Sequence, residues 1–313
     1  MENLNSFNRR DFMRLAGMAG AAALVAPGLA FEEAKKRKFQ IGSTFILWGY
    51  GADALEPSLK DIASLGYHSF ETFGQVMEQY DKKPGGFAEI VQKYKVPIVS
   101  AFCTHDVLDP AKTAAEVEKL RRWCKILKAN GGKVIEYCAG GSRRGYDYKN
   151  YKKNLVDSMN MYGKVAQEEG LVCALHPHTG TPIETEEEIY FIMENVDTRY
   201  MKFGPDVGQI QKGGGDPVKI CKDFMDLIEH VHLKDFAGGD NGYLGYSPLG
   251  EGKVQLATIM DMLEKRKKKM AGMVMFELDY DNRVKPPYSP LEAAKISRDF
   301  MAKLDYKFEP KTI

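Results

Sequence analysis

The sequence lacks several features that define common classes of protein. No apolar run among its 313 residues reaches the roughly 18 residues that a membrane-spanning helix needs. Its 44 basic and 43 acidic side chains leave a formal net charge of +1, whereas a nucleic-acid-binding protein normally has a basic excess. Its five cysteines include no Cys-x-x-Cys pair, and their odd number argues against a complete set of disulfides. We therefore expect no nucleic-acid partner and no membrane span in the mature chain.

What is present is the composition of an ordinary globular protein. Hydrophobic residues make up 44% of the chain and charged residues 28%. An aromatic content of 11% with almost no net charge excludes a disordered chain. The densest basic run, residues 265–269, closes an amphipathic segment, and we interpret it as a solvated helix end.

Residues 1–30 have the pattern of an export signal. Arg9 and Arg10 precede an apolar stretch over residues 15–25 and a small-residue cleavage site. The segment resembles a twin-arginine signal with its Arg-Arg-x-Phe core intact, although two positions differ from the usual residues; a fraying N-terminal helix is the alternative. We expect a mature chain over residues 31–313 that acts in the periplasm or otherwise outside the cytoplasm.

Strand-like and helix-like segments alternate eight times along the rest of the chain. Short runs rich in β-branched and aromatic residues predict strands that begin near Phe39, Tyr67, Val96, Lys133, Leu171, Tyr200, Ile228 and Gly272. Amphipathic patterns between them predict helices over residues 55–65, 87–94, 113–128, 150–169, 184–194, 217–225, 256–269 and 291–304. The strands begin about 28 to 44 residues apart, which is the length of a strand–helix–strand unit with a right-handed crossover.

Eight such units favour an α/β fold, a single (β/α)₈ TIM barrel over residues 31–313. An open, doubly wound sheet is the alternative. It would carry a glycine-rich phosphate loop after its first strand, and residues 41–45 do not form one. In a TIM barrel the chemistry lies at the carboxyl ends of the strands, so that is where we look for a site.

Histidines and carboxylates gather at those predicted strand ends. They are His176 and His178 after strand five, Asp206 after strand six, His230 and His232 at strand seven and Glu277 at strand eight. Because residues i and i+2 lie on the same side of a strand, one histidine of each pair can reach the barrel axis while the other lies one layer deeper. Any single histidine could be structural, but four aligned strand ends predict a metal site. Two imidazoles and two carboxylates accept Mn²⁺, Fe²⁺, Co²⁺ or Zn²⁺.

The carboxyl-terminal half also contains a series of motifs in a characteristic order. They are Leu-His-Pro-His-Thr-Gly-Thr at 175–181, Ile-Glu-Thr-Glu-Glu-Glu-Ile at 183–189, Asp-Val-Gly-Gln at 206–209, Gly-Asp-Pro at 215–217, His-Val-His-Leu-Lys-Asp at 230–235, Leu-Gly-Glu-Gly at 249–252 and Phe-Glu-Leu-Asp at 276–279. This set resembles the xylose-isomerase-like TIM barrel superfamily of sugar isomerases and epimerases, and its inosose dehydratase branch most closely. The resemblance covers roughly residues 170–305 and is only architectural before them.

The resemblance implies one divalent ion held by the residues that end strands five to eight. At the matching positions this chain has His176, Asp206, His232 and Glu277, with His230 behind them as a positioning residue. We expect Mn²⁺, with Co²⁺, Fe²⁺, Zn²⁺ and Mg²⁺ as alternatives. The superfamily's ketose 3-epimerases carry a glutamate where this chain has a histidine at strand five, which favours elimination over simple epimerisation.

Four residues are candidates for contact with the substrate. Trp48 could stack on a sugar face or pack in the core, and His105 could bind substrate or be a loop histidine without a function. Glu71 lies in strand two. Gln209 stands where the superfamily usually has a histidine after strand six, so it can hydrogen-bond a hydroxyl but cannot relay protons.

Four residues are candidates for proton transfer. His178 and Glu277 are the expected bases, and Glu136 stands behind them because a carboxylate inside an apolar run needs a partner or a task. A structural pair with a lysine or arginine is the alternative for Glu136. Lys234 or a metal-bound water is the expected acid, although Lys234 could instead form an internal ion pair with Asp235 or face an anionic group.

The expected reaction follows from the metal. A carbonyl bound to a divalent ion has an acidic α C–H, because the ion stabilises the enediolate as charge develops. After a base removes that proton, loss of a β-oxygen gives an unsaturated ketone. We predict a lyase for an unphosphorylated keto-sugar or keto-glycoside such as a 3-keto-glucoside. A metal-dependent isomerase or epimerase and a non-catalytic, exported sugar-binding barrel are the alternatives, and association into a homo-oligomer stays open.

Overall fold

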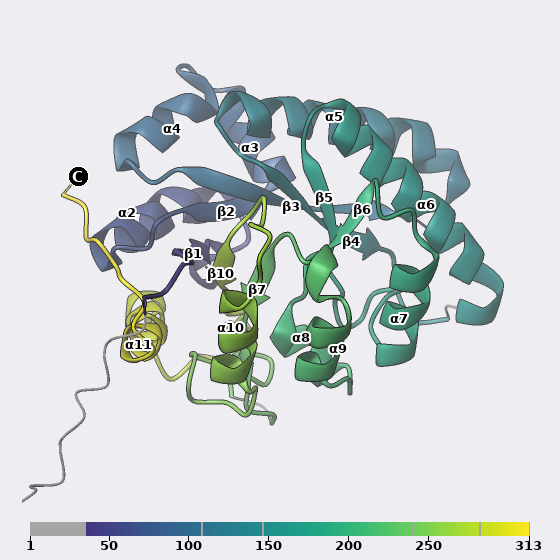
Figure 1. The fold of residues 1–313 in the computed structure, drawn as a ribbon. Helices are drawn as coiled ribbons and strands as arrows, with labels where there is room; N and C mark the ends of the chain where they lie inside the picture. Colours follow the sequence, from purple (N-terminus) through teal and green to yellow (C-terminus); the bar gives the residue numbers. More distant parts are fainter. Residues whose placement is uncertain (1–35, 108, 146, 240, 282, 313) are drawn as a thin grey trace, which may run out of the picture. The chain divides into compact units, whose positions relative to one another are not determined.

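The computed structural model describes residues 36–312 apart from 108, 146, 240 and 282. The predicted export signal lies outside these described residues. Figure 1 shows strands in the centre of the described residues with helices around them. No helix in the described ranges has the length and apolar character needed to cross a membrane.

Eight parallel strands line the centre. They are β1 (Ile41–Thr44), β2 (Phe70–Phe73), β3 (Ile98–Asp106), β4 (Val134–Gly140), β5 (Val172–Leu175), β6 (Met201–Phe203), β7 (Val231–Leu233) and β10 (Val274–Phe276). They pair in the order β6-β5-β4-β3-β2-β1-β10-β7. Isolated parallel bridges join Phe203 to Ile228 and Asp206 to His232, which links the two ends of that order. The predicted TIM barrel is confirmed, and each strand begins within three residues of the position that the sequence indicates.

Helices follow the strands in sequence. They are α2 (Leu55–Leu65), α3 (Gly74–Asp81), α4 (Gly86–Tyr94), α5 (Thr113–Ala129), α6 (Tyr148–Glu168), α7 (Glu186–Asn195), α8 (Val207–Lys212), α9 (Pro217–Asp223), α10 (Leu256–Glu264) and α11 (Pro290–Lys303). Local sequence explains several ends: α7 begins with a capping box between Thr185 and Glu188, and α2 ends at Gly66 in the left-handed conformation that glycine adopts without strain. Two of these helices, α3 and α8, were not predicted from the sequence.

The basic run at 265–269 is not a solvated helix end, and that prediction was wrong. Helix α10 ends at Glu264, five residues before the predicted boundary. Arg266 is only 8% exposed, and its guanidinium donates to the carbonyl of Ile228 at 2.6 Å. The chain leaves the helical path here because it must turn back to the start of β10.

Alternation along the strands separates two environments. In β4, Tyr137 points outwards and its ring stacks on Tyr162 of α6 at 5.1 Å. Its neighbour Glu136 is fully buried on the other side of the strand, next to His176. Outward residues therefore make the apolar layer between strands and helices, while the polar residues at the carboxyl ends face one another inside the barrel.

Candidate metal centre

Four side chains from four neighbouring strand ends meet inside the barrel. They are His176 after β5, Asp206 after β6, His232 in β7 and Glu277 after β10, and each offers a ligand atom within 4.8 Å of the others. All four are buried. The backbone fixes them: the N–H of His176 donates to Tyr137 O at 2.8 Å, and the N–H of Glu277 donates to Leu233 O at 3.1 Å, so both continue the strand ladders.

The donor atoms of this cluster suit a divalent cation. Nε2 of His176 is buried and has no hydrogen-bond partner among the described residues, and Oδ2 of Asp206 lies 3.9 Å from it. Nδ1 of His232 lies 3.1 Å from Oε2 of Glu277. Burial and the nearby His232 lower the pKa of His176, so its imidazole is neutral and able to coordinate. Two imidazoles and two carboxylates, buried with few other partners, are a set that fits a borderline divalent metal.

Glu71 and His230 form a layer beneath the cluster. Oε1 of Glu71 lies 2.9 Å from Nε2 of His232, and its Oε2 accepts hydrogen bonds from Ser100 at 2.5 Å and from Nε2 of His230 at 3.1 Å. Nδ1 of His230 accepts from the backbone N–H of Met273, which fixes the tautomer of this ring. Glu71 therefore holds His232 with Nδ1 towards the cluster, as the partners of metal-binding histidines commonly do.

Burial by itself would raise the pKa of Glu71. The charge and hydrogen bonds of His232 and His230 outweigh that effect and lower the pKa to about 2. The prediction that Glu71 contacts substrate is corrected, because both carboxylate oxygens are occupied and the side chain lies one layer below the strand ends. Its position behind His232 makes it a positioning residue.

We expect Glu71→Gln to weaken metal binding by about 10- to 100-fold, since outer-layer partners of metal ligands typically contribute that much. The amide oxygen can still accept one hydrogen bond, but the charge that favours the ligating tautomer is gone. Competition with a fluorescent chelator measures the affinity. An unchanged dissociation constant for the variant would show that Glu71 has no influence on the ion.

Lys234 is enclosed by carboxylates. Its Nζ lies 2.9 Å from Asp206 Oδ2, 2.6 Å from Glu277 Oε1 and 2.8 Å from Asp279 Oδ2. Burial disfavours the charged lysine, but the three carboxylates outweigh it and raise its pKa well above the usual value. The alternative of an ion pair with Asp235 is wrong, because the Asp235 carboxylate instead accepts the backbone N–H groups of Gly250, Gly252 and Val254, in the loop between β9 (Tyr246–Ser247) and α10.

Glu136 faces the interior rather than a basic partner. Its Oε1 lies 3.4 Å from Nδ1 of His176, and its Oε2 has no hydrogen-bond partner among the described residues. A Cβ at Gly204 would lie 2.2 Å from Oε1, so glycine at that position leaves room for the carboxyl group. Burial raises the pKa of Glu136 well above its ordinary value, so this carboxyl group holds its proton more tightly than an exposed glutamate does. A raised pKa strengthens a carboxylate as a base, so the role of Glu136 as a base behind His178 and Glu277 stays a prediction.

His178 and Gln209 meet at the edge of the cluster. Nε2 of His178 lies 2.8 Å from the amide nitrogen of Gln209, which also donates to Asp279 at 3.2 Å. Nδ1 of His178 lies 2.8 Å from the carbonyl of Thr179, so the ring is the tautomer with its proton on Nδ1 and a lone pair on Nε2. Gln209 orients this histidine, and its own groups are occupied by protein partners.

Two predicted substrate contacts lie away from the cluster. His105 is on the outer side of β3, where its ring stacks on Tyr137 at 5.5 Å and on Tyr162 at 5.0 Å. Its assignment to the substrate is corrected, because alternation from Phe102, which faces inwards, turns residue 105 towards the helices. The indole N–H of Trp48 donates to Asp61 of α2 at 2.8 Å, which directs its polar edge to a helix.

A row of aromatic rings reaches from the surface to the cluster, and the sequence did not reveal it. Tyr280 stacks on Tyr50 at 5.4 Å, Tyr50 on Phe73 at 6.4 Å, and Phe73 contacts Phe102 at 5.6 Å. The ring of Phe102 meets His176 edge-on at 5.1 Å. Tyr50 is 42% exposed. These residues come from separate strand ends, so only the closed barrel brings them together.

Arg143 connects two loops near the cluster. Its guanidinium makes two hydrogen bonds to the Glu188 carboxylate, at 2.9 and 2.7 Å, and one to the carbonyl of Thr181. Burial opposes ionisation of Glu188, but Arg143 and two backbone N–H groups outweigh it and lower the pKa of this carboxyl from its ordinary value of 4.5. The link ties the loop after β4 to the segment that carries His178.

We expect Arg143→Met to destabilise the protein by about 1 kcal/mol at pH 7, because the arginine is partly exposed and the pair is screened by solvent. The folded-state pKa of Glu188 is lowered, so its contribution is present above pH 4.5 and is lost as the pH falls through that lowered value. Urea unfolding of both proteins from pH 7 to pH 3 checks this. A difference that grows towards low pH would contradict the assignment.

Comparison with known proteins agrees with this architecture. A family model described as a xylose isomerase-like TIM barrel matches residues 59–304. An inosose dehydratase from Geobacillus kaustophilus is 30% identical over 217 residues, covering 63% of this chain and 69% of that relative. The structure of a 3-keto-D-glucoside 4-epimerase from E. coli superimposes with a TM-score of 0.63 at 19% identity, covering 86% of this chain and 99% of the other. The IolI protein with a bound zinc atom gives a TM-score of 0.68 at 15% identity, with 87% and 100% covered.

The fold and the buried cluster define a (β/α)₈ barrel with a candidate metal centre at the carboxyl ends of its strands. The chain belongs to the xylose isomerase-like TIM barrel family. With relatives that are named inosose dehydratases, it is an enzyme of this kind, and the alternative of a non-catalytic binding barrel is set aside. At under 25% identity the structural neighbours show the fold alone.

Proposed function

We propose that the protein is a divalent-metal-dependent lyase that eliminates a β-oxygen from a keto-sugar or keto-glycoside, for example a 3-keto-glucoside. The observation that carries the proposal is the position of Lys234. A buried, protonated ammonium group lies within 2.9 Å of two carboxylates of the candidate metal centre. A cationic acid at that place can protonate a leaving oxygen next to the reacting carbon. Simple epimerisation has no leaving oxygen and does not need such an acid.

The metal would be held by His176, Asp206, His232 and Glu277, and when bound it would polarise the substrate carbonyl and acidify the adjacent C–H. Among the chain's own residues, His178 offers a lone pair on Nε2 and serves as the base. It is held in that tautomer by the Thr179 carbonyl, so it needs only to exchange its contact with Gln209 for the substrate C–H. Burial alone would raise the pKa of Glu277, but His232 and Lys234 outweigh it and lower that pKa well below its ordinary value, which weakens Glu277 as a base.

Lys234 gives a proton to the departing oxygen. Its three carboxylate partners keep it charged and fix the Nζ position. One of its three N–H groups must exchange its carboxylate for the departing oxygen before the proton is transferred. The aromatic row from Tyr50 to Phe102 offers apolar faces on which the C–H side of a pyranose ring can stack. Inosose dehydration in the Geobacillus relative is also loss of an oxygen beside a ketone, which supports this reaction class.

The test uses purified protein, Mn²⁺ and a panel of 3-keto-glycosides, with enone absorbance as the readout. We expect absorbance that depends on both protein and metal. The absence of enone across the panel, with Mn²⁺ or Co²⁺ present, would overturn elimination. Elemental analysis of protein purified without added metal identifies the ion, which we propose to be Mn²⁺.

A metal-dependent epimerase or isomerase is the second candidate, and the likeness to the E. coli 3-keto-D-glucoside 4-epimerase supports it. The two reactions separate in D₂O. Epimerisation places solvent deuterium in a sugar that keeps all its oxygens, whereas elimination releases a β-substituent in proportion to the enone formed.

We also propose that the protein is exported. The support is the Arg9-Arg10 pattern and its apolar stretch in the sequence, and an unphosphorylated substrate fits a location outside the cytoplasm. Replacing both arginines with lysine is expected to leave the protein in the cytoplasmic fraction. Equal distribution of the two forms would contradict a twin-arginine signal.

A further inference from the structure

A second cavity lies at the opposite end of the barrel from the metal centre. It has a volume of about 460 Å³ and is lined by Lys38, Phe39, Gln40, Arg266, Lys267, Lys268, Lys269, Met270, Gly272 and Met273. Lys38 to Gln40 directly precede β1, and Gly272 and Met273 directly precede β10. The cavity is therefore at the amino ends of these strands, whereas His232 and Glu277 are at the carboxyl ends.

Arg266 is the central feature of this cavity. It is only 8% exposed, and one guanidinium nitrogen, Nη1, donates to the carbonyl of Ile228. Its Nε and Nη2 are buried and have no hydrogen-bond partner among the described residues. An arginine keeps its charge in proteins, so the cavity contains a desolvated cation with two unused donors on one edge of its planar fork. Such donors are normally satisfied, and an oxyanion matches their geometry.

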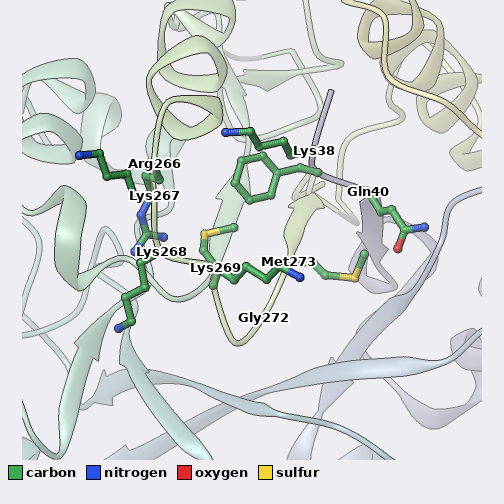
Figure 2. Close-up of a pocket in the computed structure, with 10 residues that line it drawn as sticks. Lys38, Gln40, Arg266, Lys267, Lys268, Lys269, Gly272 and Met273 are labelled. Carbon is green, nitrogen blue, oxygen red and sulfur yellow. The ribbon is translucent and has the colours of Figure 1, made fainter. Parts of the chain in front are cut away.

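The other charged residues that line the cavity are basic, and the acidic neighbours behind them, Glu229 and Glu264, are held by Lys268 and by the backbone N–H of Lys38. Lys268 pairs with Glu229 at 2.6 Å, and Nζ of Lys38 donates to the carbonyl of Glu264. Lys267 and Lys269 make no ion pair with any described residue, and no acidic residue lines the cavity. Figure 2 shows Arg266, Lys267 and Lys268 on one side and Lys38 and Gln40 on the other, with Lys269 running across towards Met273.

We propose that this cavity binds a tetrahedral oxyanion, a phosphate group carried by a small molecule or by a lipid headgroup. The unused edge of Arg266 donates to two oxygens of the phosphate, and Lys269 contributes a second positive charge. A group with two negative charges matches this excess of cations better than a carboxylate with one. Phe39, Met270 and Met273 give the same cavity an apolar wall for the rest of the ligand. No nucleophile or carboxylate lines it, so the site binds and does not catalyse.

The test is calorimetric titration of the full protein with inorganic pyrophosphate, at low and moderate salt. Saturable binding that weakens with salt is expected. We expect Arg266→Met to reduce the affinity at least about 10-fold, in line with the loss of charge-assisted hydrogen bonds. Lys269→Met changes an exposed side chain that the fold does not need, and we expect a loss of about 3-fold or more. Lys125→Met, an exposed change on α5, is the matched control and should leave the affinity unchanged.

Two further experiments distinguish a lipid headgroup from a soluble phosphate, and distinguish binding in this cavity from binding at the metal centre. Sedimentation with phosphatidylglycerol vesicles detects a headgroup: binding to vesicles but not to pyrophosphate, lost in the Arg266 and Lys269 variants, identifies a lipid. The titration is repeated with Asp206→Asn, and unchanged affinity for pyrophosphate in this variant excludes binding at the metal centre. No binding in either arm, or binding that survives both basic-residue substitutions, would overturn the proposal.

Discussion

Replacing Asp206 with asparagine is expected to abolish metal binding and to reduce kcat/KM about 10³-fold or more, while the fold remains intact. Oδ1 of Asp206 caps α8 by accepting the backbone N–H groups of Gly208 and Gln209, both at 2.9 Å, and an asparagine oxygen can do the same. Only Oδ2, which faces His176 and Lys234, loses its charge. Metal catalysis contributes several kcal/mol, and each 1.4 kcal/mol is about tenfold in rate.

The chain offers a matched control for this variant. Asp216 caps α9 in the same way, with its Oδ1 accepting from Val218 and Lys219, but it is exposed and far from the cluster in the fold. Asp216→Asn should therefore retain stoichiometric metal and full activity. Elemental analysis and the enone assay measure both variants. Full metal content in Asp206→Asn would remove Asp206 from the ligand set.

Lys234→Met is expected to stop the elimination and to destabilise the metal-free protein by about 3–5 kcal/mol. Removing one partner from a buried ionic group leaves the others without compensation, and here three carboxylates lose their ammonium group. A divalent ion restores part of that charge balance. We therefore expect Mn²⁺ to raise the Tm of Lys234→Met by more than it raises the Tm of the unmodified protein.

The same variant distinguishes the role of Lys234 in the reaction. With His178 intact, exchange of the substrate's α-proton with D₂O should continue, whereas loss of the β-oxygen should fall about 10²- to 10⁴-fold, the usual contribution of a general acid. Lys212→Met is the control, because Lys212 also lies over the Tyr246 ring but donates to the carbonyl of Leu244 instead of to carboxylates. Elimination at the normal rate in Lys234→Met would transfer the acid role to another group.

The order of elements and the position of the candidate centre could be predicted because both depend on local patterns. Hydrophobic runs with helical segments between them indicated eight units, and a parallel barrel places the ends of all its strands at one rim. His176, Asp206, His232 and Glu277 therefore had to lie near one another once each was placed at a strand end. His230 behind His232 follows from the same two-residue period.

The predictions that failed are those that depend on which side of a strand a residue faces, or on how deep in the barrel it lies. His105 was expected after strand three, but β3 continues to Asp106, so alternation turns the ring towards Tyr137 and the helices. Glu71 lies in β2 as the sequence indicated, yet one layer too deep to meet a substrate. Helix α10 ends before the basic run, and Arg266, two residues further on, is buried against the Ile228 carbonyl, a contact between distant segments that the local pattern does not reveal.

The sequence by itself determined the (β/α)₈ class and which imidazoles and carboxylates end neighbouring strands, since periodicity and strand polarity are encoded locally. Only the tertiary structure decided how those groups are paired. It placed Lys234 among three carboxylates from two strand ends, aligned Glu71 behind His232, buried Glu136 beside His176 and assembled the aromatic row and the basic cavity. Each of these depends on distances between segments far apart in the chain, which barrel closure and side-chain packing set together.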